Sequence, residues 1–205
     1  MDSPAKGERK MLPAETKEQV AEASPRRKAR IAGVFYLLTI LTGAFAAFVS
    51  GKLVVYGDAF SLVATACYVV VTVLFYGLFK LVDESLSLIA ALFSLVGCAI
   101  SAANVFHLVS YPLRAVNPLA LFGVYCLLIG YLIFRSTFLP RILGVLLAFG
   151  GLSWLTFISP ELANYFSPYN LAPGILGEGA LTVWLLLFGV NTERWKEQAG
   201  AGGEL

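Results

Sequence analysis

The sequence predicts an all-α membrane protein, a polytopic bundle of six transmembrane helices with both termini in the cytoplasm. Three observations support this prediction. Of the 205 residues, 58% are hydrophobic and only 14% are charged, whereas soluble domains carry about 25% charged residues. Apolar runs of about twenty residues, the length that crosses about 30 Å of hydrocarbon, alternate with short polar segments. Lysine and arginine residues gather at the ends of alternate runs.

The N-terminal segment, residues 1–30, carries scattered charges of both signs and ends in the basic cluster RRKAR at 26–30. Such a composition buries too little apolar surface to fold alone, so we expect a disordered cytoplasmic tail. The apolar run that follows is too long, and too far from the N-terminus, for a secretory signal peptide. We therefore expect it to be an uncleaved first span.

The apolar runs predict one membrane domain over residues 31–191, followed by a short cytoplasmic tail over 192–205. The six expected spans are 31–50, 58–80, 86–110, 118–135, 139–159 and 171–190. The connections are short, apart from 160–170 (PELANYFSPYN). No soluble catalytic domain fits between the spans, so any chemistry must lie within the bundle, in that loop or in the tails.

The orientation follows from the basic residues near the ends of the spans. If the N-terminus is cytoplasmic, the other side carries only Lys52 and Arg114. The cytoplasmic side then carries Arg26, Arg27, Lys28, Arg30, Lys80, Arg135, Arg141, Arg194 and Lys196. This bias predicts a multi-pass protein with both termini inside.

Several classes of function lack support in the sequence. The net charge of +2 gives no argument for nucleic-acid binding, so the expected partner is the lipid bilayer. The three cysteines lie inside apolar runs without a CxxC spacing, and we expect buried apolar fillers rather than disulfides. Metalloprotease, hydrolase and nucleotide-binding motifs are not found. The single histidine, His107, does not make a convincing metal site with one carboxylate and one amide, and we expect neither metal nor cofactor.

Two polar stripes at helical spacing are expected to serve helix packing. The second span carries Asp58, Ser61, Thr65, Tyr68, Thr72 and Tyr76 on one face. The third span carries Ser87, Ala90, Ser94, Gly97, Ser101, Asn104 and Leu108 on one face. Asp58 stands at the outer end of its helix, where an acidic residue in the first turn complements the helix dipole.

Three residues are harder to place in a bilayer: Glu178, Asn104 and His107. Glu178 lies about seven residues, or roughly 10 Å, from the outer end of the sixth span, and Asn104 lies at a similar depth in the third. An ionisable group at such depth costs at least about 2.5 kcal/mol unless it faces protein or water. The sequence therefore predicts an outer-side polar pocket formed by Glu178, Asn104 and His107, with Asp58 as a further candidate.

Glu178 admits two interpretations of equal weight. It is either a tether that bonds Asn104, His107 or a hydroxyl of the second span, or part of a cavity that binds a ligand or relays a proton. Three glycines at 174, 177 and 179 either let a neighbouring helix approach Glu178 or mark a frayed helix end.

The leading hypothesis for function is the binding or movement of a small molecule, lipid or proton through the outer-side pocket. A first alternative is a membrane-embedded enzyme in which Glu178 and His107 act as acid and base. A second alternative is a structural or sensory membrane subunit whose tail contacts a cytoplasmic partner. A non-enzymatic role is favoured.

Four segments carry a family resemblance. They are FGVYCLLIGYLIFRSTFLPRILGVLLAFGGLSWL (122–155), RKARIAGVFYLLTILTG (27–43), AALFSLVGCAI (90–100) and GEGALTVWLLLFGVN (177–191). Together they resemble the domain-of-unknown-function 4386 family of small bacterial integral membrane proteins. The resemblance implies a six-span bundle in a bacterial cytoplasmic membrane and implies no activity.

The most specific part of the resemblance is FRSTFLPRILG at 134–144. Arg135 and Arg141 flank a tight cytoplasmic turn, and Pro140 opens the fifth span, where a missing N–H costs nothing. We expect these three residues to be topology anchors, with both arginines at the headgroup level. The alternative role for the arginines is to bind a lipid phosphate or a cytoplasmic partner.

Overall fold

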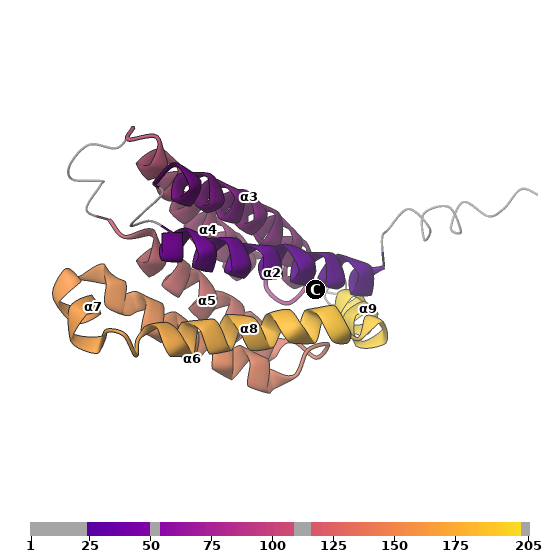
Figure 1. Ribbon diagram of the computed structural model, residues 1–205. Helices are drawn as coiled ribbons and strands as arrows, with labels where there is room; N and C mark the ends of the chain where they lie inside the picture. Colours follow the sequence, from indigo (N-terminus) through magenta and orange to yellow (C-terminus); the bar gives the residue numbers. More distant parts are fainter. Residues whose placement is uncertain (1–23, 50–53, 109–115, 202–205) are drawn as a thin grey trace, which may run out of the picture.

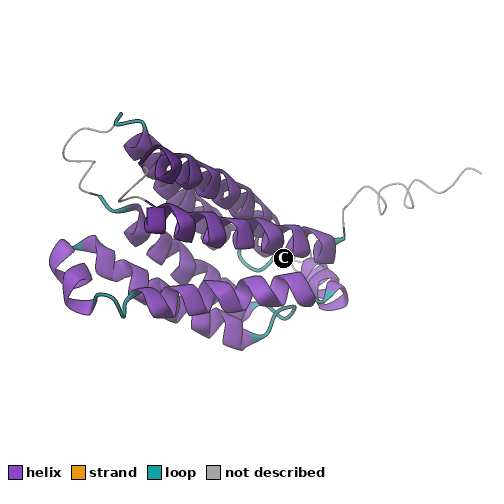
Figure 2. Ribbon diagram, in the orientation of Figure 1, coloured by secondary structure: helices purple, strands orange, loops and turns teal. Residues whose placement is uncertain are grey.

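The computed structural model describes residues 24–49, 54–108 and 116–201, and all regular structure within these ranges is helical. Figure 1 shows the helices in chain order, and Figure 2 shows short loops between helices of the described ranges. The elements are α2 (Pro25–Val49), α3 (Val54–Phe79), α4 (Glu84–Val105), α5 (Pro118–Arg135), α6 (Arg141–Leu155), η2 (Thr156–Ile158), α7 (Pro160–Phe166), α8 (Leu171–Leu187) and α9 (Thr192–Ala201).

The described residues contain five helices that are long and apolar enough to cross a membrane: α2, α3, α4, α5, and α6 with η2. A sixth span is formed if α7 and α8, which meet at a bend of 83°, count as one broken span. The predicted all-α membrane bundle is therefore confirmed. The protein is membrane-embedded.

The bend at the start of the sixth span differs from our expectation of a loop over 160–170. Residues Pro160–Phe166 form the short helix α7. Pro160 occupies the first helical position, and the Ser159 hydroxyl accepts a hydrogen bond from the backbone N–H of Leu162. A capped start with proline at the first position is a strong local helix signal, which explains why this segment folds.

The first span begins earlier than expected. Since α2 starts at Pro25, the basic cluster 26–30 belongs to a helix rather than to the predicted tail. Arg26 Nε donates to the carbonyl of Phe188, and Arg30 donates to the carbonyl of Leu187, each over 3.2 Å. These arginines satisfy carbonyls at the C-terminal end of α8, where a positive charge also complements the helix dipole. Residues 1–23 of the predicted tail lie outside the described residues.

The six main helices form a closed ring. Each of α2, α3, α4, α5 and α6 packs against the next, α6 packs against α8, and α8 returns to α2. Large buried side chains such as Tyr36, Phe75, Ile129 and Leu181 fill the centre. In this order α4 and α8 are not packed as neighbours, which decides what Glu178 can touch.

The contact between α5 and α6 depends on paired glycines. A Cβ atom placed on Gly151 would lie 2.7 Å from the carbonyl oxygen of Gly123, and one placed on Gly130 would lie 2.7 Å from that of Gly144. No side chain fits at such distances. Small residues at helix contacts allow this close backbone approach within a membrane, where packing rather than hydrophobic burial holds helices together.

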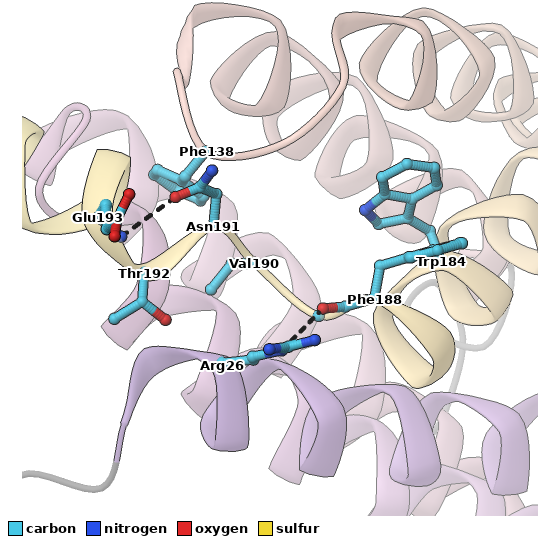
Figure 3. Close-up of a pocket in the computed structure, with 9 residues that line it drawn as sticks. Arg26, Phe138, Trp184, Phe188, Val190, Asn191, Thr192 and Glu193 are labelled. Atoms are coloured by element: carbon cyan, nitrogen blue, oxygen red, sulfur yellow. Dashed lines mark hydrogen bonds between the residues drawn. The ribbon is translucent and has the colours of Figure 1, made fainter.

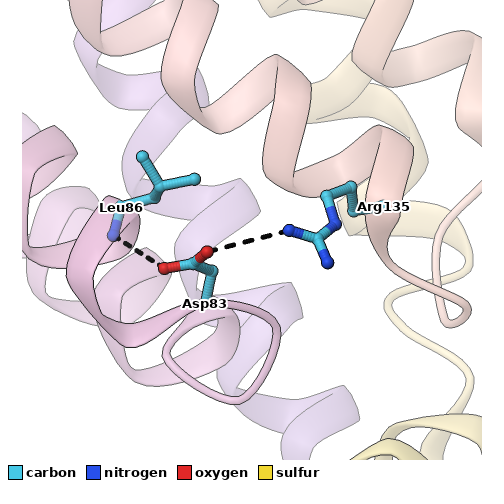
Figure 4. Close-up of polar contacts among 3 residues, drawn as sticks. All are labelled: Asp83, Leu86 and Arg135. Atoms are coloured by element: carbon cyan, nitrogen blue, oxygen red, sulfur yellow. Dashed lines mark hydrogen bonds and ion pairs between the residues drawn. The ribbon is translucent and has the colours of Figure 1, made fainter.

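The predicted anchors gather at one end of the ring, which we name the basic end. Arg135 forms an ion pair of 3.7 Å with Asp83, whose other oxygen caps α4 by accepting from the N–H of Leu86 (Figure 4). Arg141 lies over the ring of Phe134, and Pro140 is the N-cap residue of α6 rather than its first helical residue.

The helix α9 also covers the basic end. We expected residues 192–205 to be a tail, yet Thr192–Ala201 is helical. The indole nitrogen of Trp195 donates to the carbonyl of Leu78, and the backbone N–H of Thr137 donates to the side chain of Gln198. The helix is thus fixed to the end of α3 and to the turn between α5 and α6.

Candidate functional site

Glu178 lies near the middle of α8, seven residues from its first residue and nine from its last. At 1.5 Å per residue this is about 10 Å from one end of the helix and about 13 Å from the other. The side chain is half-buried. The position along the helix, about seven residues from its start, therefore agrees with the sequence-based one, and the carboxyl group stands close to the middle of α8.

The carboxyl group of Glu178 receives two hydrogen bonds from neighbouring helices. Trp154 of α6 donates from Nε1 to Oε1 over 2.9 Å, and Cys126 of α5 donates from Sγ to the same oxygen over 3.5 Å. Within the described part of the chain Oε2 receives no hydrogen bond, and it is not among the fully buried atoms that lack a partner. Oε1 thus takes both hydrogen bonds from the neighbouring helices, and Oε2 takes neither.

Gly174 makes this arrangement sterically possible. It precedes Glu178 by one helical turn, and a Cβ atom at its position would collide with the indole ring of Trp154. Gly177 similarly lets the backbone of α6 approach, since its Cβ would meet the carbonyl of Leu146. Of the two interpretations of these glycines, the structure favours the one in which they admit a neighbouring helix to Glu178.

Three tyrosines lie beside this carboxyl group. The ring centroids of Tyr36 and Tyr68, and those of Tyr68 and Tyr125, are each 5.7 Å apart in edge-to-face geometry. The Tyr36 hydroxyl lies next to the Glu178 carboxyl without meeting hydrogen-bond geometry. All three hydroxyls are buried and find no hydrogen-bond partner among the described residues. Leaving such a group unpaired costs about 1–3 kcal/mol.

The polar groups continue from Tyr125 toward the opposite side of the ring. The Thr72 and Ser94 hydroxyls share a hydrogen bond of 2.6 Å, and Thr72 also donates to the carbonyl of Tyr68. All six helices of the ring therefore contribute to one interior set, which we name the central polar cluster. Its members are Tyr36, Tyr68, Thr72, Ser94, Tyr125, Cys126, Trp154 and Glu178.

The other predicted pocket residues lie elsewhere. Asn104 is in the last turn of α4, which ends at Val105 rather than near 110, and its buried Oδ1 has no partner in the described chain. His107 is exposed just beyond that helix, with a φ of 53°. Among the described residues no hydrogen bond or ion pair joins Asn104 or His107 to Glu178.

Asp58 is half-buried in the second turn of α3 rather than in its first, because the helix begins at Val54. Within the part of the chain that the structure describes, no hydrogen bond or ion pair joins Asp58 to Glu178. The structure thus gives Glu178 different neighbours from those expected. A ligand-binding role for Asp58, Asn104 and His107 stays a prediction.

The partners of Glu178 carried only weak signals in the sequence. Cys126 was expected to be an apolar filler; it is indeed free and buried, and it also donates to a carboxylate. Trp154 has a single polar atom in a large apolar ring. The usable signal was the presence of Tyr36, Tyr68 and Tyr125 in the middle of spans, since a buried phenol needs a partner.

Two pockets among the described residues lie at the basic end, away from Glu178. The one in Figure 3 has a volume of about 450 Å³ and lies between the start of α2, the end of α8 and the start of α9. Arg26 lines it together with Trp184 and Phe188, whose rings are tilted by 36° with their centroids 4.5 Å apart. Asn191 borders it and caps α9 by accepting from the N–H of Glu193.

Comparison with known families gives a match in the second half of the chain. The model of a domain of unknown function, DUF4386, matches residues 115–189. The DUF4386 segment extends from α5 to α8 and confirms the resemblance drawn from the sequence. It contains Cys126, Trp154 and Glu178, whereas Tyr36 and Tyr68 lie outside the matched DUF4386 segment. Neither a curated protein nor a solved structure matches the chain.

Proposed function

We propose that this membrane protein binds and releases a proton at Glu178 and couples that event to the packing of α8 against α5 and α6. The oxygen Oε2, which takes neither of the two hydrogen bonds, carries the proposal. Both donors, Trp154 and Cys126, bond to Oε1, so a proton can attach to Oε2 while both hydrogen bonds remain. The ionised form is also supported, because hydrogen bonds to a charged acceptor are stronger than those to a neutral one.

The hydroxyl groups of the central polar cluster support a relay. A hydroxyl both donates and accepts hydrogen bonds, so it can pass a proton along a row of such groups. The unpartnered hydroxyls of Tyr36, Tyr68 and Tyr125 lead from Glu178 toward Thr72 and Ser94. Ordered water is the natural partner for buried polar groups of this kind, and it would complete the row.

We place the basic end at the cytoplasmic face of a bacterial cell membrane, with both termini inside. Arg26, Arg135, Arg141 and Arg194 at this end fit the positive-inside rule. The bend between α7 and α8 then lies on the outer side. Access to Glu178 from that side follows the shorter path, about 10 Å along α8.

Fluorescence of Trp154 tests the proposal directly, because its indole is bonded to the titrating group. In a Trp184→Phe, Trp195→Phe background, Trp154 is the single tryptophan of the chain. We expect its emission to follow a one-proton titration when the protein in lipid nanodiscs is taken through a pH series. Glu178→Gln in the same background should abolish the titration. An unchanged titration in the glutamine variant would refute proton binding at Glu178.

A structural role for Glu178 is the second candidate. Its two hydrogen bonds join α8 to both α5 and α6, which favours the tether interpretation. The two candidates predict different results in the same experiment. A pure tether gives Trp154 emission that does not depend on pH, together with a loss of stability when Glu178 is replaced by leucine. Proton binding gives emission that depends on pH even where stability is unaffected.

A further inference from the structure

We infer that the second pocket at the basic end binds the headgroup of an anionic phospholipid, with an acyl chain along the outer face of α6. The pocket has a volume of about 670 Å³ and lies between the α5–α6 turn and α9. Thr137, Pro140, Arg141, Arg194, Glu197 and Gln198 are among the residues that line it. Two arginines against one glutamate leave the lining with a net positive charge.

Both arginines are held in place by neighbouring groups. Arg194 Nη1 donates to the carbonyl of Thr137, and the Thr137 hydroxyl bonds in turn to the carbonyl of Arg194 and to Gln198. The guanidinium of Arg141 lies 5.7 Å from the centre of the Phe134 ring. Such contacts reduce the freedom that each side chain would lose on binding. The planar fork of a guanidinium suits the oxygens of a phosphate.

An exposed apolar face leads away from this pocket along α6. Ile142, Val145, Phe149 and Leu152 are 60%, 50%, 61% and 55% exposed, and their spacing of three, four and three residues places them on one side of the helix. This face begins next to Arg141 and runs toward the middle of the span. A polar pocket joined to an apolar face matches a molecule with a charged head and a hydrocarbon chain.

The position of the pocket argues for a lipid over a soluble anion. It lies where a membrane-spanning helix begins, at the level at which lipid phosphates are found. Basic pockets between helices at that level bind anionic headgroups. A soluble anion would contact the arginines but not the apolar face of α6. A substitution on that face therefore distinguishes a lipid from a soluble anion.

The experiment measures binding of phosphatidylglycerol and phosphatidylcholine to the full chain in detergent by native mass spectrometry. We expect phosphatidylglycerol to bind at least about tenfold more tightly than phosphatidylcholine, and Arg141→Gln and Arg194→Gln each to weaken it by about tenfold. The control is Arg27→Gln, which removes the same charge from an exposed residue that lines neither pocket. If Arg27→Gln weakens phosphatidylglycerol binding equally, the affinity reflects general surface charge and the inference of a specific site is wrong.

Two further variants keep the inference testable if Arg141→Gln does not fold. Arg141→Lys preserves the charge and should retain most of the preference for phosphatidylglycerol. Phe149→Ala, on the exposed face, should weaken the binding of phosphatidylglycerol. It should leave the competition by glycerol phosphate for the pocket unchanged. If glycerol phosphate binds as tightly as the whole lipid, or if both lipids bind equally, the lipid site is wrong. Glu178→Gln should bind the lipid as wild type does, so this outcome is independent of the proposed proton site.

Discussion

The indole nitrogen of Trp154 and the carboxyl oxygen Oε1 of Glu178 are 2.9 Å apart, and this hydrogen bond joins the end of α6 to the middle of α8. It is a contact between a buried aromatic donor and a carboxyl group within a membrane span. Three predictions concern this contact and its surroundings, and a fourth concerns the ion pair at the basic end.

Trp154→Phe should destabilise the protein by about 1.5–3 kcal/mol, the usual contribution of a hydrogen bond to a charged group. Phenylalanine loses the donor and also the part of the indole, including Cζ2 and Nε1, that lies closest to Gly174. The measurement is chemical unfolding in detergent, followed by helix content. A double-mutant cycle with Glu178→Leu isolates the pair, because leucine removes the acceptor that glutamine would keep. A coupling energy of zero would show that the two residues do not interact.

Gly174→Ala should destabilise the protein by about 1–3 kcal/mol, because the new methyl group overlaps the Trp154 ring. The same helix offers a matched control in Gly179, whose added Cβ would meet nothing within 4 Å. Gly179→Ala should instead stabilise the helix by up to about 1 kcal/mol. Thermal unfolding of both variants provides the comparison, and equal effects would contradict the steric argument.

Glu178→Gln should keep the fold, because the amide oxygen still accepts from Trp154 and Cys126. Glu178→Leu leaves both donors buried without an acceptor, at a cost of about 1–3 kcal/mol for each unpaired group. The midpoint of thermal unfolding in detergent distinguishes the two variants. Wild-type stability of the leucine variant would eliminate the tether interpretation.

Replacing Asp83 by alanine should destabilise the protein more than replacing its ion-pair partner, Arg135, by glutamine. Arg135→Gln removes a half-exposed ion pair, which contributes at most about 1 kcal/mol, and a contact of the guanidinium with the Tyr131 ring, 5.9 Å from its centre. Asp83→Ala also removes the cap on α4, which contributes about 1 kcal/mol by itself. Asp83→Asn is the matched control, because it retains a capping oxygen and loses the charge. Asparagine and alanine variants of equal stability would contradict a capping role.

The sequence predicted the spans well because hydropathy and length act locally. The helix over 118–135 was predicted with its observed bounds, and the turn between Arg135 and Arg141 was placed correctly. Errors arose where backbone geometry ends a helix without a strong sequence signal. His107 adopts a positive φ two residues after α4 ends, and neither glycine nor proline marks that point.

The neighbours of Glu178 could not be predicted in the same way. Depth along a span is a property of one helix, and Asn104 was paired with Glu178 on depth alone. Contact also depends on the order of helices around the ring, which places α5, α6 and α2 rather than α4 beside Glu178. That order arises from glycine contacts between particular helices, such as Gly123 with Gly151, and no single span reveals them.

The closure of the ring between α2 and α8 has a consequence for how the protein is made. Ribosomes deliver the spans in chain order, so α2 remains without its second neighbour until α8 has entered the membrane. Until then the indole of Trp154 and the thiol of Cys126 have no acceptor, and Arg26 and Arg30 have no helix end to bind. Insertion of α8 is thus the step of assembly that closes the helix bundle and completes these hydrogen bonds.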